Sequence, residues 1–181
     1  MKEALRWLCR VTVYTLYRVL YDKFNRHGRA SRISELYLSC FFLIGLLTLV
    51  CAQYVRGEWV VTGVLIICFY RSWEIFVFSL KWMFVDEGPV ISYRRSLAFL
   101  LLNLVEVVIL FAASYLAVGF VDGLMSAIYA SLRISATVGP QSGFPDDGAL
   151  AQVLIAWQIA VSVFLIIVAI AHVVGGVGRR S

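Results

Sequence analysis

The sequence predicts an all-α membrane protein with four transmembrane helices, a short re-entrant helix before the last of them, and an amphipathic N-terminal segment. Three observations carry this prediction: 61% of the 181 residues are apolar or aromatic, only 15% are charged, and the apolar residues gather in four long runs. A soluble chain of this size could not cover so much apolar surface, so lipid is the solvent for most of it. The bilayer is therefore the first expected partner.

Residues 1–34 form a basic segment that we expect to lie at the cytoplasmic membrane surface. Lys2, Arg6, Arg10 and Arg18 fall on one stripe of a helix, among aromatic and aliphatic side chains. This mixture suits the headgroup boundary. The segment is interpreted as a membrane-lying anchor, and the alternative is a gating element or a docking site for a cytosolic protein partner.

Four apolar runs are long enough to cross a hydrocarbon core of ~30 Å. Two form a hairpin over residues 35–80, a polar loop follows over 81–96, and the other two runs cover 97–120 and about 149–174. Eight Lys and Arg residues precede the first run, three lie in the polar loop, and two lie in the basic tail, 175–181. The positive-inside rule then predicts a multi-pass protein of the cell (inner) membrane with both termini cytoplasmic.

The segment between the last two runs is too apolar for a solvated loop. Residues 123–135 have apolar side chains at helical spacing, and Asp122 is the expected N-cap. A helix of about 13 residues is only ~20 Å long and cannot span. A return over 136–148, with glycine and proline, follows it. Because non-helical backbone at membrane depth survives only inside protein or beside water, the pattern predicts a re-entrant segment.

This arrangement resembles the pore domain of the potassium-channel superfamily: outer helix, pore helix, filter and inner helix. The stretch SAIYASLRISATVG, residues 126–139, is similar to the pore-helix and filter pattern of that family, and the resemblance covers about residues 94–174. It implies a channel-like pore domain over 97–174 and a homotetramer around one axis. Thr137, Val138 and Gly139 would then supply filter carbonyls to a permeant ion.

The sequence departs from the family's pattern after Gly139. Pro140 stands where the family has an aromatic residue, and it lacks the N–H that this strand uses. Arg133 lies behind the filter-like loop, where we expect it to pair with Asp146 or Asp147. The alternatives are that it faces the pore, where it would repel cations or attract anions, or that it is solvent-exposed in the outer vestibule. These departures predict altered or lost potassium selectivity.

Charged and polar residues also fall inside the apolar runs. Arg71 and Glu74 share one face of the second run, and Asn103 and Glu106 lie in the third. Intramembrane charge normally faces protein or water, so Arg71 is expected to pair with Glu74 or Glu106 between the two helices. A single arginine carries too little gating charge for a voltage sensor.

The fourth run has a weak polar stripe of Gln158, Ser162 and His172. In the resemblance to the channel family this helix lines the inner cavity, so these three residues are candidate cavity residues. His172 could respond to pH, and the alternative is a satisfied histidine at the interface.

The sequence carries no constellation typical of an enzyme, and neither a cofactor, a metal nor nucleic acid is expected as a ligand. The expected function is a tetrameric channel-like pore. The alternative is a non-conducting membrane scaffold with a channel-derived fold that docks a cytosolic partner, for example in a bacterial stress-response or antiviral defence system.

Overall fold

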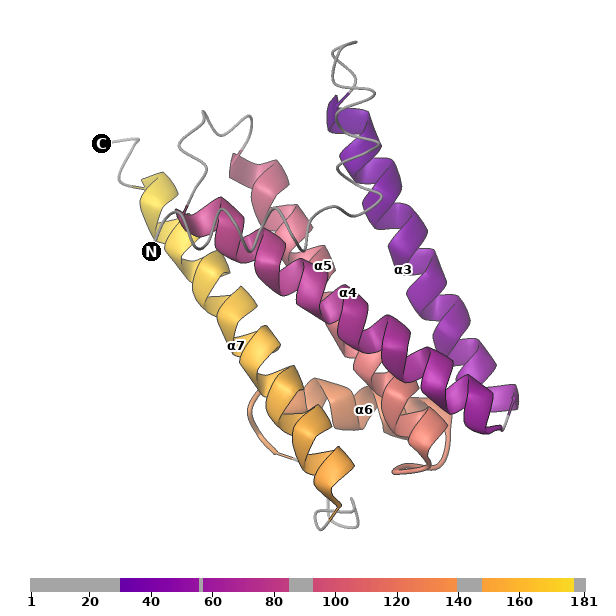
Figure 1. The fold of residues 1–181 in the computed structure, drawn as a ribbon. Helices are drawn as coiled ribbons and strands as arrows, with labels where there is room; N and C mark the ends of the chain where they lie inside the picture. The colour runs from indigo at the N-terminus through magenta and orange to yellow at the C-terminus, as the bar shows by residue number, and fades with distance from the viewer. Residues whose placement is uncertain (1–29, 56, 85–92, 140–147, 178–181) are drawn as a thin grey trace.

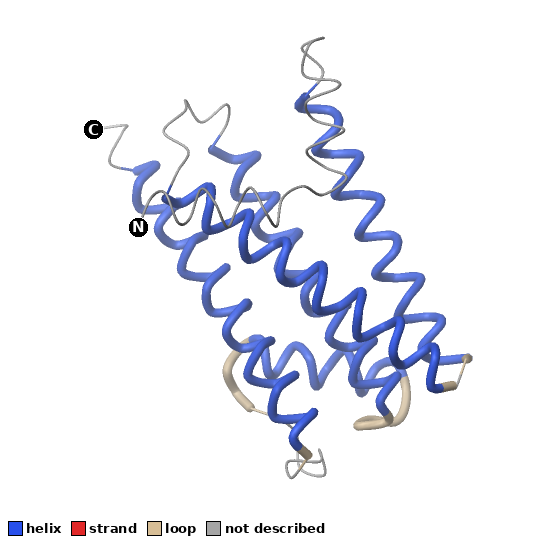
Figure 2. The backbone as a smooth tube through the Cα atoms, viewed as in Figure 1, coloured by secondary structure: helices blue, strands red, loops and turns tan. Residues whose placement is uncertain are grey.

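The computed structural model describes residues 30–55, 57–84, 93–139 and 148–177, and all its regular elements in these ranges are helices. Four of them are long: α3 (Ala30–Tyr54), α4 (Glu58–Phe84), α5 (Tyr93–Val118) and α7 (Ala149–Val177). The fifth, α6 (Leu124–Ser135), has only 12 residues. Figure 2 shows this all-helical architecture.

The four long helices are long and apolar enough to cross a membrane, which confirms the prediction of a multi-pass membrane protein. The candidate spans are Leu36–Tyr54, Glu58–Leu80, Leu97–Val118 and Ala149–Ala171. Helices α3, α4 and α5 extend beyond the predicted boundaries, so residues 30–34, 81–84 and 93–96 are helical rather than loop. The amphipathic segment predicted over 1–34 lies outside the described residues up to residue 29.

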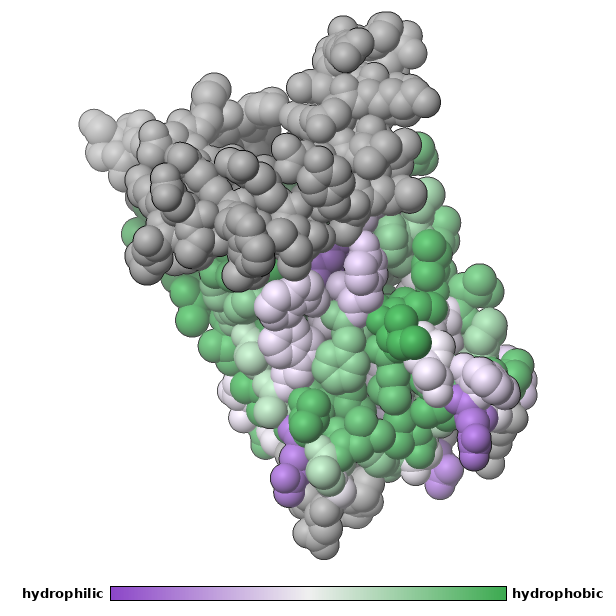
Figure 3. All heavy atoms as spheres, viewed as in Figure 1, coloured by the Kyte–Doolittle hydropathy of each residue, from purple (hydrophilic) through white to green (hydrophobic). Residues whose placement is uncertain are grey.

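The long helices alternate in direction, so the beginning of α3 and the end of α7 lie at the same end of the bundle (Figure 1). Helix α6 lies across the other end, beside the last turns of α5 and the first turns of α7. In the face that Figure 3 shows, apolar residues dominate the middle of the bundle. Hydrophilic residues gather near the α3–α4 turn and the start of α7.

Helix α5 is the centre of the bundle, and it packs against all the other described helices. Its residues from Val107 to Tyr115 are buried without interruption. Glycine 119 ends the helix: it has φ 80°, and Phe120 N–H donates to the carbonyl of Tyr115 at 2.9 Å. A left-handed residue just after the last turn is a common helix stop, because the following N–H groups can bond back to the helix.

Candidate functional site: the α6 seat and the Arg71 cluster

Helix α6 is held by a group of buried neutral polar side chains that we call the α6 seat: Tyr115, Ser131, Ser135, Gln158 and Ser162. All five are at most 6% exposed. The side-chain amide of Gln158 donates to the carbonyl and hydroxyl oxygens of Ser131, both at 2.8 Å, and to Ser135 Oγ at 2.7 Å. Its carbonyl oxygen accepts a hydrogen bond from the Tyr115 hydroxyl.

Further bonds tie the seat to the neighbouring helices. Ser131 Oγ donates to the backbone carbonyl of Val108 in α5 at 2.8 Å, and Ser162 Oγ donates to Ser135 Oγ at 3.2 Å. The short helix is thus bonded to α5 and α7 through side chains that water cannot reach. Small residues (Ala127 and Ala130) bring its backbone close to the bundle, and both are fully buried.

The structure places Gln158 and Ser162 differently from the prediction that they line a cavity. The two side chains do share one face of α7, as the spacing predicts, but that face packs on α6 and both residues are 0% exposed. Buried hydroxyl groups need hydrogen-bond partners, and Gln158 and Ser162 of α7 supply them to α6. The side chain of His172 lies outside the described part of the structure.

The N-terminus of α6 also differs from the prediction. Its N-cap residue is Gly123, with φ 88° and ψ 147°, and no side chain caps the first turn. Asp122 is exposed one residue earlier. A glycine fits here because positive φ is strained for residues with a Cβ atom.

The C-terminus of α6 leads directly into the Thr-Val-Gly tripeptide. Thr137 N–H donates to the carbonyl of Ile134 at 3.0 Å, and Val138 N–H donates to that of Arg133 at 2.9 Å. These two bonds form a Schellman-type cap, in which Thr137 takes the left-handed position with φ 60°. A β-branched residue is unusual there, since left-handed backbone costs roughly 1–2 kcal/mol for a residue with a Cβ atom.

The same two bonds fix the direction of two carbonyl groups. In a trans peptide the N–H and the preceding C=O point to opposite sides. The N–H groups of Thr137 and Val138 point back into α6, so the carbonyl oxygens of Ala136 and Thr137 point away from it. Gly139 again has positive φ, 87°, and Pro140 lies outside the described residues.

Arg133 lies in the last turn of α6 and is partly exposed. Its guanidinium carbon is 5.9 Å from the centre of the Tyr129 ring, a cation–π distance. Its predicted partners Asp146 and Asp147 lie outside the described residues. The pairing with these carboxylates therefore stays a prediction.

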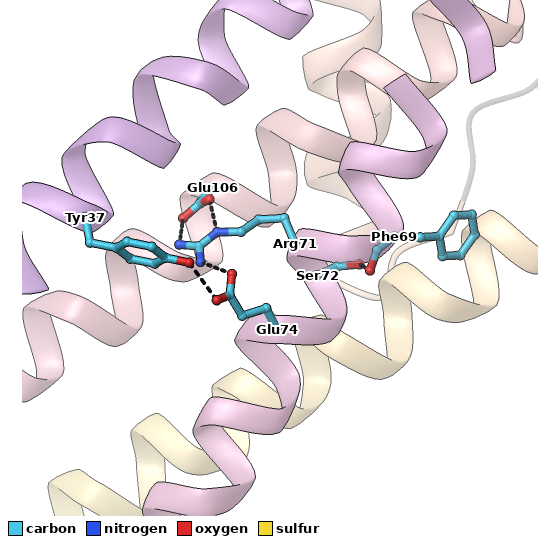
Figure 4. Close-up of polar contacts among 6 residues, drawn as sticks. All are labelled: Tyr37, Phe69, Arg71, Ser72, Glu74 and Glu106. Carbon is cyan, nitrogen blue, oxygen red and sulfur yellow. Dashed lines mark hydrogen bonds and ion pairs between the residues drawn. The ribbon is translucent and has the colours of Figure 1, made fainter. Parts of the chain in front are cut away.

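The second polar site, the Arg71 cluster, consists of Tyr37, Arg71, Glu74 and Glu106 and joins α3, α4 and α5 (Figure 4). Arg71 Nε and Nη2 donate to the two carboxylate oxygens of Glu106 at 2.6 and 3.0 Å. Arg71 Nη1 donates to Glu74 Oε2 at 2.6 Å, and the Tyr37 hydroxyl donates to Glu74 Oε1 at 2.6 Å. The structure thus brings together the three charged residues that the sequence singled out.

The arginine of this cluster is also covered by aromatic rings. Its guanidinium carbon is 4.3 Å from the centre of the Phe41 ring and 5.3 Å from that of Tyr37. Arg71, Glu74 and Glu106 are 4%, 8% and 1% exposed. The bidentate ion pair with Glu106 is stronger than the single bond to Glu74, because two parallel N–H···O bonds fix both groups.

Several residues of these sites were not predicted from the sequence. These residues carry single hydroxyl groups within apolar runs, where nothing in the sequence distinguishes them from other membrane residues. They are Tyr37, Tyr115, Ser131 and Ser135. A contact outside the two sites was not predicted either: the Trp157 ring nitrogen donates to Ser72 Oγ at 2.8 Å, and Ser72 in turn donates to the carbonyl of Phe69 (Figure 4 shows this second bond). A useful signal for Ser131 and Ser135 was their i, i+4 spacing, which puts both hydroxyl groups on one face of α6.

The described residues include no group of three or more His, Cys, Asp or Glu side chains that could hold a metal ion. Comparisons of the chain with protein-family models, with curated proteins and with solved structures give no match.

Proposed function

We propose that the chain is the subunit of a tetrameric channel-like pore in the cell membrane, with both termini cytoplasmic and with altered or lost potassium selectivity. One observation carries the proposal: a short helix, seated by buried hydrogen bonds, ends in two successive carbonyls that point away from it. Rings of backbone carbonyls are the ligands that channels use to replace the hydration shell of a cation. Four copies around one axis would form such a ring from Ala136 and Thr137.

The helix dipole supports the same arrangement. The C-terminus of a helix carries a partial negative charge, which favours a cation beside the carbonyls of Ala136 and Thr137. Arg133 acts against it, since its positive charge lies in that same last turn. A ring of four Arg133 side chains would lower cation occupancy, in line with a pore that does not select potassium.

The position of Arg133 also favours a second candidate function, the non-conducting scaffold that docks a cytosolic partner. Four guanidinium groups beside the loop would make a cation barrier. A protein of this kind would keep the four-fold assembly and the α6 seat but pass no ions. The basic N-terminal segment would supply the docking surface.

Flux and mass measurements on the full chain test the proposal. We expect native mass spectrometry in mild detergent to give four copies, and liposomes containing the protein to leak K⁺, Na⁺ or Cl⁻. Arg133→Ala should raise cation flux, whereas Thr62→Ala should leave it unchanged, because Thr62 is exposed on α4 and its hydroxyl donates to the Glu58 carbonyl of the same helix. A number of subunits other than four would overturn the proposal of a tetrameric pore. A tetramer that passes no ion, as wild type or as Arg133→Ala, would favour the scaffold.

A further inference from the structure

Thr137 is a strained residue in the loop that follows α6. Its φ of 60° lies in the left-handed region, and the other described residues with positive φ are glycines. Left-handed backbone is disfavoured by a factor of about 5–30 for a residue with a Cβ atom, and β-branched residues are rare there. Such strain persists only where other interactions hold it, so these interactions decide whether Thr137 stays left-handed.

One hydrogen bond of the α6 cap depends on the left-handed backbone of Thr137. The N–H of Val138 follows the φ and ψ bonds of Thr137, and it donates to the carbonyl of Arg133 at 2.9 Å. The N–H of Thr137 precedes both of these bonds, so its 3.0 Å hydrogen bond to Ile134 does not depend on them. Rotation of Thr137 into the extended region therefore breaks the Val138 bond and spares the Ile134 bond.

The surroundings of Thr137 allow this rotation without moving α6. Residues 136–138 are exposed, so burial contributes little to the conformation of Thr137. Ser135, two residues earlier, is buried and accepts a hydrogen bond from Gln158 of α7 at 2.7 Å. The α6 seat thus holds the last turn of the helix, and the freedom begins after it.

The two opposing contributions to this equilibrium are of similar size. The net gain from one hydrogen bond favours the left-handed form by a factor of about 2–12. The strain at Thr137 favours the extended form by a factor of about 5–30. Neither form then exceeds the other by much more than about tenfold, and a minor form at such a ratio is populated enough to detect.

We propose that Thr137 is a two-state switch at the end of α6. In the left-handed form its carbonyl points away from α6, and in the extended form the peptide between Thr137 and Val138 turns and redirects this carbonyl. The carbonyl of Ala136 belongs to the preceding peptide and keeps its direction. The switch is a property of the single chain and does not depend on the proposed pore. In such a pore, each subunit would present one fixed carbonyl and one movable carbonyl.

Hydrogen exchange of the Val138 amide tests the switch, measured by nuclear magnetic resonance on the full chain in micelles. This amide exchanges when its bond to Arg133 is broken. Thr137→Gly removes the strain of the left-handed form, so it should slow the exchange about fivefold or more, after correction for the intrinsic rate of each sequence. Thr137→Val keeps the β-branched carbon and lacks the hydroxyl group, so its exchange should match that of the wild type.

The amide of Ala136 is the internal control. It donates to the carbonyl of Leu132 at 2.9 Å and precedes Thr137, so its exchange should be the same in all three proteins. The backbone carbon chemical shifts of Thr137 in the wild type give a second measurement. They should lie between the values typical of left-handed and of extended backbone.

Equal exchange of the Val138 amide in the wild type and in Thr137→Gly would overturn the proposal. Equal slowing by Thr137→Gly and Thr137→Val would also overturn it, because the hydroxyl group rather than strain would then be the cause. A parallel change at Ala136 would show that the end of α6 frays as a whole. If the variants fail to fold, wild-type shifts of Thr137 that match one form alone still overturn the switch.

Discussion

The α6 seat and the Arg71 cluster lie in the same bundle, but the first is built from neutral groups and the second from charges. In the seat, one glutamine amide satisfies hydroxyl groups from two other helices. In the cluster, one guanidinium serves two carboxylates on two helices. Loss of the glutamine amide removes hydrogen bonds between neutral groups in the first site, whereas loss of the guanidinium leaves two carboxylates without a cation in the second. The two sites should therefore differ in how much a single substitution costs.

The largest effect is expected for Arg71→Met in the Arg71 cluster. The change leaves the carboxylates of Glu74 and Glu106 without their shared cation, and breaking a buried pair costs about 3–5 kcal/mol. The free energy of unfolding in mixed micelles, followed by circular dichroism, measures it. Adding Glu106→Gln to Arg71→Met should recover part of the loss, because only one of the two carboxylates is then left without a cation. Equal stability of Arg71→Met and wild type would show that water reaches the cluster.

A smaller effect is expected for Gln158→Leu in the α6 seat. Leucine fills similar space but cannot make the hydrogen bonds of the amide to Tyr115, Ser131 and Ser135, and a lost intramolecular hydrogen bond costs about 0.5–1.5 kcal/mol. The rate of backbone amide hydrogen exchange should rise more in α6 than in the core of α5. Ser162→Ala removes only the 3.2 Å bond to Ser135 and serves as the mild comparison. Unchanged exchange in α6 would mean that packing alone seats the helix.

The smallest effect is expected for Tyr37→Phe. The phenyl ring keeps its place over Arg71, and the hydroxyl bond to Glu74 is lost. Side-chain hydrogen bonds within membranes average about 0.6 kcal/mol, and the same unfolding assay can resolve such a change against Tyr54→Phe. Tyr54 is 81% exposed at the end of α3, so its variant should match wild type. A loss as large as that of Arg71→Met would show that Tyr37 holds the whole cluster together.

Sequence patterns predicted those features that follow from the free-energy cost of exposing apolar surface to water or unpaired charge to lipid. Long apolar runs must span, so four helices could be placed to within a few residues. Charges inside such runs must pair, so Arg71, Glu74 and Glu106 could be grouped before their contacts were known. Helix ends were less predictable, because a short turn such as 119–123 depends on backbone conformation. Asp122 looked like a cap, yet Gly123 takes that position.

The α6 seat was beyond prediction for a different reason. Periodicity shows that Gln158 and Ser162 share a face, but it does not show which helix that face meets. The resemblance to a channel predicted that this face lines a cavity. In the structure the face packs inside the chain, against the hydroxyl groups of α6. A serine within an apolar run carries no sign of its partner, because the backbone carbonyl one turn earlier can also accept its proton.

The pairing of Arg71 with Glu106 also bears on how the chain enters the membrane during synthesis. Helix α4 carries Arg71 and Glu74 near its middle, and charged side chains there are costly to release into lipid. The second carboxylate that binds Arg71, that of Glu106, lies 35 residues further along the chain, on α5. Helix α4 would therefore stay at the insertion machinery until α5 arrives, and the two would leave as a hairpin. A chain cut before α5 should integrate poorly, and replacing both Arg71 and Glu74 with leucine should restore its integration.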